Sequence, residues 1–476
     1  MAHYFKYKSV ADIEAESQRL HLDLRFADDL APLFRPVTLG SLTVGNSLVV
    51  QPMEGCDCTP DGTPDELTVR RYHRFGGGGA KLIWGEAAAV IEEGRANPRQ
   101  LLVSEATLPA LAGLVETCRA AHRESCGDDS DLIIGLQLTH SGRYCYRRPL
   151  IATHDAALDP RTVADRATGR TVGPDYPLLD DDYLKRLVDH FVTAAKLARR
   201  AGFQFVDLKQ CHRYLLNELL GARTRPGPFG GDFANRTRLT RDIVTAIRTA
   251  VPGLIVATRL NVFDGLPYRS GPDKVGVPCE HPRPLADGWG MCLDDPHTPD
   301  LTEPMKLIGE LRQVGVTLLN VSMGNPYASP HIVRPFEYPP PDGYETPEHP
   351  LVGVNRHFRL AESIHRANPG LPVVGSGYSF LQEFLPQAAA ANLRDDRCTF
   401  VGVGRATLAQ PDFVKQLQDH GRLDRKRVCR TFSYCTALMR AKHNALGQYP
   451  TGCPPFDKDA YGPIWQECQE LGVKRT

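Results

Sequence analysis

The chain has 476 residues, 42% of them hydrophobic and 24% charged, which is enough for one large globular domain or two to three smaller ones. Lys plus Arg and Asp plus Glu both number 56, and no dense basic block contains interleaved aromatic residues, so no nucleic-acid partner is expected. The chain opens without an apolar signal-peptide core, and no uncharged apolar stretch reaches membrane-span length. We therefore expect a cytoplasmic protein without membrane contact.

Residues 1–34 predict an N-terminal helical arm, and eight short apolar runs after it predict strands. Each run is mostly Val, Ile, Leu or Phe without alternation, which is typical of strands buried on both faces. The runs cover 47–52, 81–86, 132–138, 203–209, 254–260, 317–323, 371–377 and 399–405.

Helical periodicity appears between these runs, for example over 181–202, 235–251 and 303–315. Eight strand–helix units predict an α/β fold, a (β/α)8 TIM barrel over residues 35–425. Two smaller α/β domains are the alternative. Residues 426–476 predict a short C-terminal extension that contains cysteines.

The longest insertions, 143–180, 262–302 and 324–350, all follow predicted strands. They therefore lie on the face where a TIM barrel carries its active site.

Three groups that handle protons, Lys209, His212 and Tyr214, lie within one short turn after the fourth predicted strand. Lys or His can polarise a carbonyl and a Tyr hydroxyl can deliver a proton, so the three can act on one substrate. A solvated helix start is the alternative. For His140, which follows the third strand, a structural histidine is an equally good interpretation.

Gln137 ends the third predicted strand and Arg259 the fifth. An amide and a cation at one barrel mouth suit the polar edge of an electron-rich planar heterocycle. A salt bridge inside the barrel is the alternative for Arg259.

Glycines mark the last two strand ends, at Gly377 and Gly404, next to Ser376 and Arg405. The loops after strands 7 and 8 of such barrels often bind phosphate, because glycine lets backbone N–H groups approach and Arg adds a two-pronged donor. Half of a dinucleotide fingerprint is the weaker alternative, since GSGYSF (375–380) lacks the third glycine.

Eight segments together resemble the Old Yellow Enzyme family of flavin-dependent ene-reductases, over about residues 33 to 420. Their style is closest to the dienoyl-CoA reductase and trimethylamine dehydrogenase branch, without its extra nucleotide-binding domains. In family order they are LFRPVTLGSLTVGNSLVVQPM (33–53), LIWGEAAAV (82–90), QLTHSGR (137–143), AAKLARRAGFQFVDLKQCHRYLLNELL (194–220), FGGDFANRTR (229–238), NVSMG (320–324), VVGSGYS (373–379) and VGVGRATLAQPDF (401–413).

The resemblance implies an FMN at the barrel mouth, with NADH or NADPH as reductant. The implied cofactor-binding residues are Pro52, Met53, Glu54 and Ala87 next to the ring system, Gln137 and Arg259 at its pyrimidine edge, and Ser376, Gly377, Gly404 and Arg405 at the phosphate.

On the substrate side, the resemblance implies that Lys209 and His212 hold a carbonyl group and that Tyr214 protonates a carbon, with Cys211 and His140 in the pocket. The implied activity is reduction of an activated C=C bond in a small oxygenated substrate, or a related dehydrogenation.

Lys209 and Glu54 depart from the family pattern. A cation at 209 favours an anionic oxygen and lowers the pKa of His212 by repulsion. A carboxylate at 54 disfavours a negatively charged reduced flavin, unless Lys209 or Arg259 neutralises it.

The 13 cysteines are odd in number and scattered, which predicts reduced thiols. Some relatives bind a [4Fe–4S] cluster after the barrel through four cysteines. Here only Cys429, Cys435 and Cys453 occupy comparable positions, and their spacing differs, so a cluster is not expected.

Two other functions stay open. A metal-dependent hydrolase would use Glu86, His140 and His212, although no clear ligand spacing supports it. A flavin-binding barrel that has lost turnover would act as a scaffold or sensor. A small molecule is the expected partner, while its identity, the choice of NADH or NADPH and homo-oligomer formation are left undetermined.

Overall fold

Eight parallel strands close into one barrel in the computed structural model, which describes residues 3–340, 343–441 and 443–473. All neighbouring strands pair in parallel, and the last pairs with the first through Val401 and Leu48. Every predicted strand is confirmed. They are β3 (Leu48–Val50), β4 (Leu82–Ala89), β5 (Ile133–Thr139), β6 (Phe205–Gln210), β7 (Ile255–Asn261), β10 (Val316–Ser322), β11 (Val373–Gly375) and β12 (Phe400–Val403).

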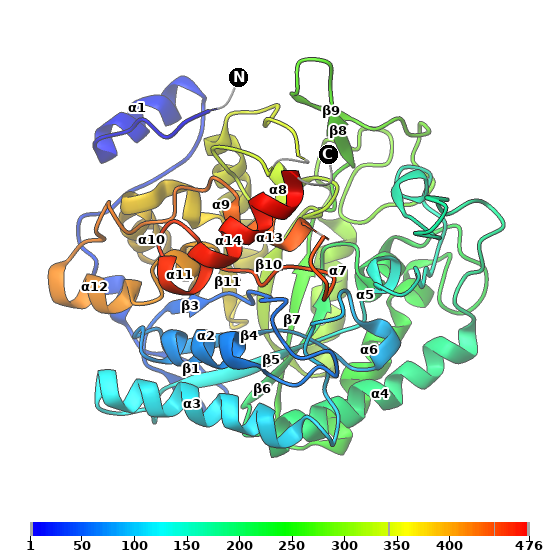
Figure 1. Cartoon of the computed structure of the whole chain (residues 1–476), viewed down its shortest axis with the longest axis horizontal. Helices are drawn as coiled ribbons and strands as arrows, with labels where there is room; N and C mark the ends of the chain where they lie inside the picture. Colours follow the sequence, from blue (N-terminus) through cyan, green and yellow to red (C-terminus); the bar gives the residue numbers. More distant parts are fainter. Residues whose placement is uncertain (1–2, 341–342, 442, 474–476) are drawn as a thin grey trace.

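Helices surround the barrel and cover its outer face (Figure 1). Helix α4 (Asp181–Arg200) illustrates why these segments are helical and pack on the barrel. The Asp180 side chain caps its first turn, and the helix buries an apolar stripe that includes Leu184, Leu187 and Phe191. This architecture confirms the predicted (β/α)8 barrel. The other covering helices are α2 (Glu66–Gly76), α3 (Leu108–Cys126), α6 (Phe233–Ala250), α7 (Thr302–Val314), α9 (Pro350–Ala367), α10 (Leu385–Arg394), α11 (Ala406–Ala409) and α12 (Phe413–His420).

A hairpin made of β1 (Val37–Leu39) and β2 (Leu42–Val44) closes the amino end of the barrel. Its Leu39 and Val44 join a separate buried cluster with Trp84, Phe205 and Phe400 from inside the barrel. No sequence pattern predicted this hairpin. Because that end is filled, the open end is the one where the strands finish.

The three long insertions carry little regular structure. They contain the hairpin of β8 (Tyr268–Ser270) and β9 (Gly276–Pro278) and the short helix α8 (Pro330–Val333). A further short helix, α5 (Leu215–Gly221), precedes α6. Short 3-10 helices occur at η1 (Ala31–Phe34), η2 (Glu92–Gly94), η3 (Gly142–Tyr144), η4 (Asp159–Arg161) and η5 (Tyr378–Phe384).

Both chain ends pack on the barrel. Helix α1 (Val10–Arg19) belongs to the N-terminal arm, while α13 (Tyr434–Arg440) and α14 (Lys458–Val473) form the extension and lie in front of the barrel in Figure 1. Asp457 anchors the extension, since it accepts from Arg70 of α2 at 2.6 and 2.8 Å and also pairs with Arg74. Among the described residues, no helix combines the length and apolarity needed to cross a membrane.

Candidate functional site

A cavity with an empty volume of about 1140 Å³ lies where the barrel strands end. Strand ends, the insertion at 324–350 and the C-terminal extension all line it. Of the predicted site residues, the cavity brings together Pro52, Met53, Glu54, Ala87, Gln137, Lys209, His212, Tyr214, Arg259, Ser376, Gly377, Gly404 and Arg405.

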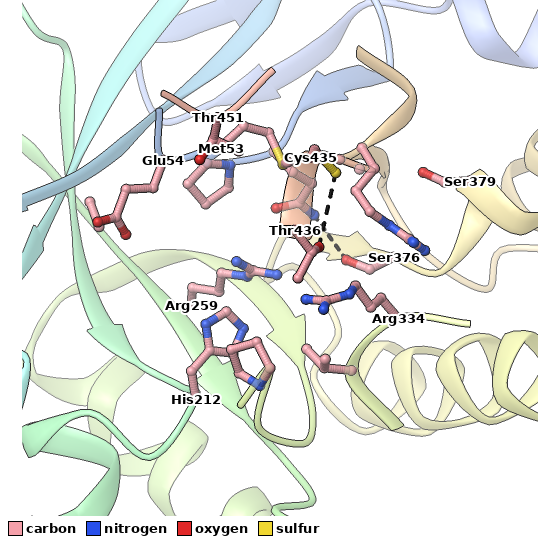
Figure 2. Close-up of a pocket in the computed structure, with 18 of the residues that line it drawn as sticks. Met53, Glu54, His212, Arg259, Arg334, Ser376, Ser379, Cys435, Thr436 and Thr451 are labelled. Carbon is pink, nitrogen blue, oxygen red and sulfur yellow. Dashed lines mark hydrogen bonds between the residues drawn. The ribbon is translucent and has the colours of Figure 1, made fainter. Parts of the chain in front are cut away.

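The turn after β6 has an unusual backbone conformation that sets the direction of its side chains. His212 and Arg213 both have positive φ values, of 66° and 61°. Such values are costly for residues other than glycine, so the surroundings must fix them. The Arg213 guanidinium does so from outside the cavity, because it forms ion pairs with Asp155 and, at 2.8 Å, with Asp264. The turn thereby directs His212 into the cavity (Figure 2).

Tyr214 is fixed on both sides. Its hydroxyl lies 3.0 Å from that of Tyr327, and the Nζ atom of Lys209 lies 3.6 Å from the centre of its ring. Burial is the main reason that the pKa of Tyr214 lies well above its ordinary value. Tyr214 therefore keeps its proton at neutral pH and can donate it.

Burial moves three further groups of the cavity, Lys209, Glu54 and His212, toward their neutral forms. It lowers the pKa of Lys209, an effect that the nearby Glu54 carboxylate opposes. It raises the pKa of Glu54, which Lys209 opposes in turn. The pKa of His212 lies well below its ordinary value because of burial first, then Arg259 and Lys209. The predicted repulsion between Lys209 and His212 is thus present but secondary.

Gln137 and Arg259 are held by one buried carboxylate, that of Asp207. Gln137 donates its Nε2 to Asp207 at 2.6 Å, and the Arg259 backbone N–H donates to the same group at 2.5 Å. Gln137 and Arg259 both line the cavity, and Arg259 Nε has no partner among the described residues. This donor and acceptor pair fits the polar edge of the FMN that the resemblance implies.

The opposite end of the cavity offers donors to an anion. Gly377 has a φ of 100°, which glycine adopts without strain. Ser376 accepts from Gln51 Nε2 at 2.9 Å, and Arg405 Nη1 has no partner in the described part of the chain. These groups fit the predicted phosphate end of FMN.

Two residues predicted for the substrate pocket, His140 and Cys211, do not line the cavity. His140 is buried beneath the loops, with Nε2 2.9 Å from the Tyr183 hydroxyl and Nδ1 accepting from the Gly142 N–H. Burial lowers the pKa of His140 to about 3, so it is a neutral structural histidine.

Glu86 also lies outside the cavity, paired with Arg71 at 2.5 Å. The structure therefore does not bring together Glu86, His140 and His212, the residues of the alternative metal site. No group of three or more His, Cys, Asp or Glu side chains among the described residues is arranged to hold a metal ion.

Cys429, Cys435 and Cys453 border a second cavity of about 670 Å³ next to the first. Although they are neighbours, they are not arranged as metal ligands within the described residues.

Several lining residues were not predicted. Tyr327 and Arg334 come from the insertion at 324–350, and Thr436, Met439 and Thr451 from the extension. Figure 2 shows Thr436 between the Arg334 side and the Met53 side of the cavity. The only sequence signal was the length of that insertion, which does not single out residues.

The chain is similar to known flavin oxidoreductases. A family model described as the NADH:flavin oxidoreductase / NADH oxidase family matches residues 32–274. An NADPH dehydrogenase of Halalkalibacterium halodurans is 25% identical over 391 residues, which cover 81% of this chain and 93% of that protein.

Two solved structures share the fold. A 2-naphthoyl-CoA reductase in complex with 2-naphthoyl-CoA has a TM-score of 0.65 at 17% identity, covering 92% of this chain and 58% of that one. An Old Yellow Enzyme homologue from Zymomonas mobilis has a TM-score of 0.58 at 20% identity, covering 84% of this chain and 96% of that one. Since the family match spans just over half of the chain, the protein belongs to the NADH:flavin oxidoreductase / NADH oxidase family and is an FMN-dependent NAD(P)H:flavin oxidoreductase.

Proposed function

We propose that this oxidoreductase reduces an activated C=C bond in a small oxygenated substrate. The observation that carries the proposal is the convergence of Lys209, His212 and Tyr214 on one cavity. The cavity also contains the groups suited to hold FMN, so flavin and substrate would meet in it.

Tyr214 is the proposed proton donor to the substrate carbon. Its raised pKa keeps the hydroxyl protonated, and the contact with Tyr327 at 3.0 Å fixes its direction. A positioned general acid accelerates such a step by about 10²- to 10⁴-fold.

Lys209 and His212 are the proposed partners of the substrate oxygen. His212 is neutral because of its lowered pKa, and its buried Nε2 has no partner among the described residues. It therefore offers a hydrogen bond without competing for the proton of Tyr214. Lys209 adds a positive charge that favours substrates whose oxygen gains negative charge during the reaction.

Gln137 and Arg259 would hold the pyrimidine edge of FMN, and Arg405 its phosphate. Bound FMN would supply the redox chemistry, taking a hydride from NAD(P)H and returning one to the substrate. The residues described here orient the reactants, exclude water and supply the proton.

Anaerobic spectroscopy of the purified protein tests this function. Flavin absorption should bleach on addition of NADPH or NADH and return on addition of cyclohexenone, with the saturated ketone as product. Bleaching without reoxidation by a panel of enones, quinones and unsaturated aldehydes would contradict C=C reduction. Absence of bleaching by either nucleotide would instead favour the scaffold or sensor alternative.

A further inference from the structure

Arg334 is a cavity residue whose role the proposed function leaves open. It follows α8 in the insertion after β10, and its side chain lines the flavin cavity. In Figure 2 it reaches toward the middle of the cavity from the side opposite Glu54. The loop is held in place from behind, where His357 Nε2 lies 3.1 Å from the Ile332 carbonyl oxygen.

The guanidinium of Arg334 forms no ion pair with an acidic side chain in the described part of the chain. Its Nε and Nη2 atoms are buried and have no hydrogen-bond partner among the described residues. Arg143 and Arg213 differ, because Arg143 pairs with Asp159 and Glu218, and Arg213 pairs with two aspartates. Two buried N–H groups of a guanidinium without partners are unfavourable, so the site suits an anion from outside the chain.

The charges around Arg334 support the same conclusion. Burial first, and then the positive charges of Arg405 and Arg440, lower its pKa to about 9. A free guanidinium has a pKa above 12, so burial and two neighbouring cations together weaken its hold on the proton. An anion between Arg334 and Arg405 would reverse this effect.

A hydrogen bond next to Arg334 brings the two arginines together. Arg405 Nη2 donates to the carbonyl oxygen of Pro335 at 2.6 Å, and Pro335 is the residue that follows Arg334 in the chain. Arg405 Nη1 is left without a partner in the described part of the chain, as are the two Arg334 nitrogens. Ser376, Gly377 and Ser379 line the same cavity. The unpartnered N–H groups of both arginines thus face a region that already has the features of a phosphate site.

We propose that Arg334 and Arg405 bind the FMN phosphate as a pair, with Arg334 as a ligand contributed by the insertion after β10. A phosphate monoester carries a charge of about −1.5 to −2 at neutral pH, which matches two guanidiniums. This inference depends on flavin binding and not on the proposed C=C reduction, so the failure of one leaves the other standing.

Flavin binding to the full-length protein tests the pair. FMN has the phosphate and riboflavin lacks it, so their affinities separate phosphate contacts from ring contacts. Both are measured from flavin fluorescence on titration into the flavin-free protein. Arg334→Gln should weaken FMN binding by about 10- to 100-fold and leave riboflavin binding unchanged, since a hydrogen bond to a charged group has this value. Arg334→Lys should restore part of the FMN affinity.

Arg430→Gln is the matched control, because Arg430 lines the neighbouring cavity and not the flavin cavity. It should bind both flavins like the unchanged protein. Equal losses for FMN and riboflavin in Arg334→Gln, or no loss for either, would overturn the proposal. Unchanged flavin binding together with a raised KM for carboxylate-bearing enones would also overturn it, since Arg334 would then bind the substrate's anion.

A second measurement guards against a variant that simply misfolds. Arg334→Met removes an unpaired buried charge, so the flavin-free variant should melt at a temperature equal to or above that of the flavin-free parent. The increase in melting temperature caused by FMN should at the same time become smaller. A flavin-free variant with a lower melting temperature and an undiminished increase on FMN addition would show that Arg334 serves the fold and not the phosphate.

Discussion

The Nζ atom of Lys209 lies 3.6 Å from the centre of the Tyr214 ring, so the cation closes one face of the proposed proton donor. A desolvated cation over an aromatic ring is stabilised by about 2 kcal/mol. Tyr327 fixes the hydroxyl from the other direction. Lys209 and Tyr214, which are five positions apart in the chain, therefore act as one unit, and the following predictions separate their contributions.

Tyr214→Phe should slow reoxidation of the reduced flavin by an enone about 10²-fold or more, because the carbon loses its proton donor. Reduction of the flavin by NADPH transfers no proton to that carbon and should change little. Rapid mixing of each half-reaction measures the two rates separately.

Tyr144→Phe is the control for Tyr214→Phe. The Tyr144 ring also packs near Tyr214, but its hydroxyl accepts from Asn325 Nδ2 at 2.5 Å and Tyr144 does not line the cavity. Both half-reactions should stay near normal in this variant. If Tyr214→Phe instead slowed flavin reduction and left reoxidation intact, its role as proton donor would be wrong.

Lys209→Met should weaken the binding of a phenolate such as para-nitrophenolate by about tenfold or more, as expected for a lost charge-assisted contact of at least about 1.4 kcal/mol. Titration of the flavin absorption bands measures the affinity. Binding of a neutral ketone should fall less. Equal affinity of both proteins for the phenolate would contradict the anchoring role of Lys209.

The pH dependence of phenolate binding follows from the lowered pKa of Lys209. Affinity should rise as the phenol ionises, because the anion is the bound form. It should then fall as pH rises through the lowered pKa of Lys209, since the cation is present only below that value. In Lys209→Met the falling part should disappear.

Local sequence patterns were sufficient to predict the barrel and about half of the residues that line its cavity. The strands were predictable because both faces are buried, and Lys209, His212 and Tyr214 because they follow one strand end within a single turn. Tyr327 and Arg334 lie in an insertion without periodicity. Met439 lines the cavity from an extension that docks on α2 through Asp457, which is 387 positions from Arg70. Such a contact has no signal in local sequence.

Arg71→Met should destabilise the protein by about 3 to 5 kcal/mol, the usual cost of removing one partner from a buried ion pair. Arg71 pairs with both Asp57 and Glu86, and all three side chains are nearly inaccessible. Urea unfolding followed by circular dichroism measures the change in the free energy of unfolding.

Arg70→Met on the same helix is the control for Arg71→Met. Arg70 pairs with Asp457 but is 36% exposed, so its loss should cost about 1 kcal/mol or less. Similar losses in both variants would show that burial does not set the strength of these pairs.

The Arg71 effect should also depend on pH. Burial raises the pKa of Glu86 to about 7. A raised folded-state pKa means that protonated Glu86 stabilises the fold at low pH and that this contribution is lost as pH rises through about 7. In Arg71→Met, ionised Glu86 no longer has the Arg71 guanidinium as its partner. The free energy of unfolding should therefore decline more steeply with pH in this variant than in the parent.

Met439→Ala tests whether the extension limits the size of the substrate. Met439 belongs to α13 and lines the flavin cavity, so its truncation should enlarge the space above the proposed substrate. The ratio of kcat/KM for a bicyclic enone to that for cyclohexenone should rise about tenfold, since one or two methylene groups in a pocket change binding by about 1 to 3 kcal/mol.

Tyr434→Ala is the matched control, because Tyr434 lies on the same helix but packs against Trp465, with ring centres 4.9 Å apart, and does not line this cavity. FMN affinity should be unchanged in both variants. A ratio that moves equally in the two would mean that α13 affects the site through its docking and not through the side chain of Met439.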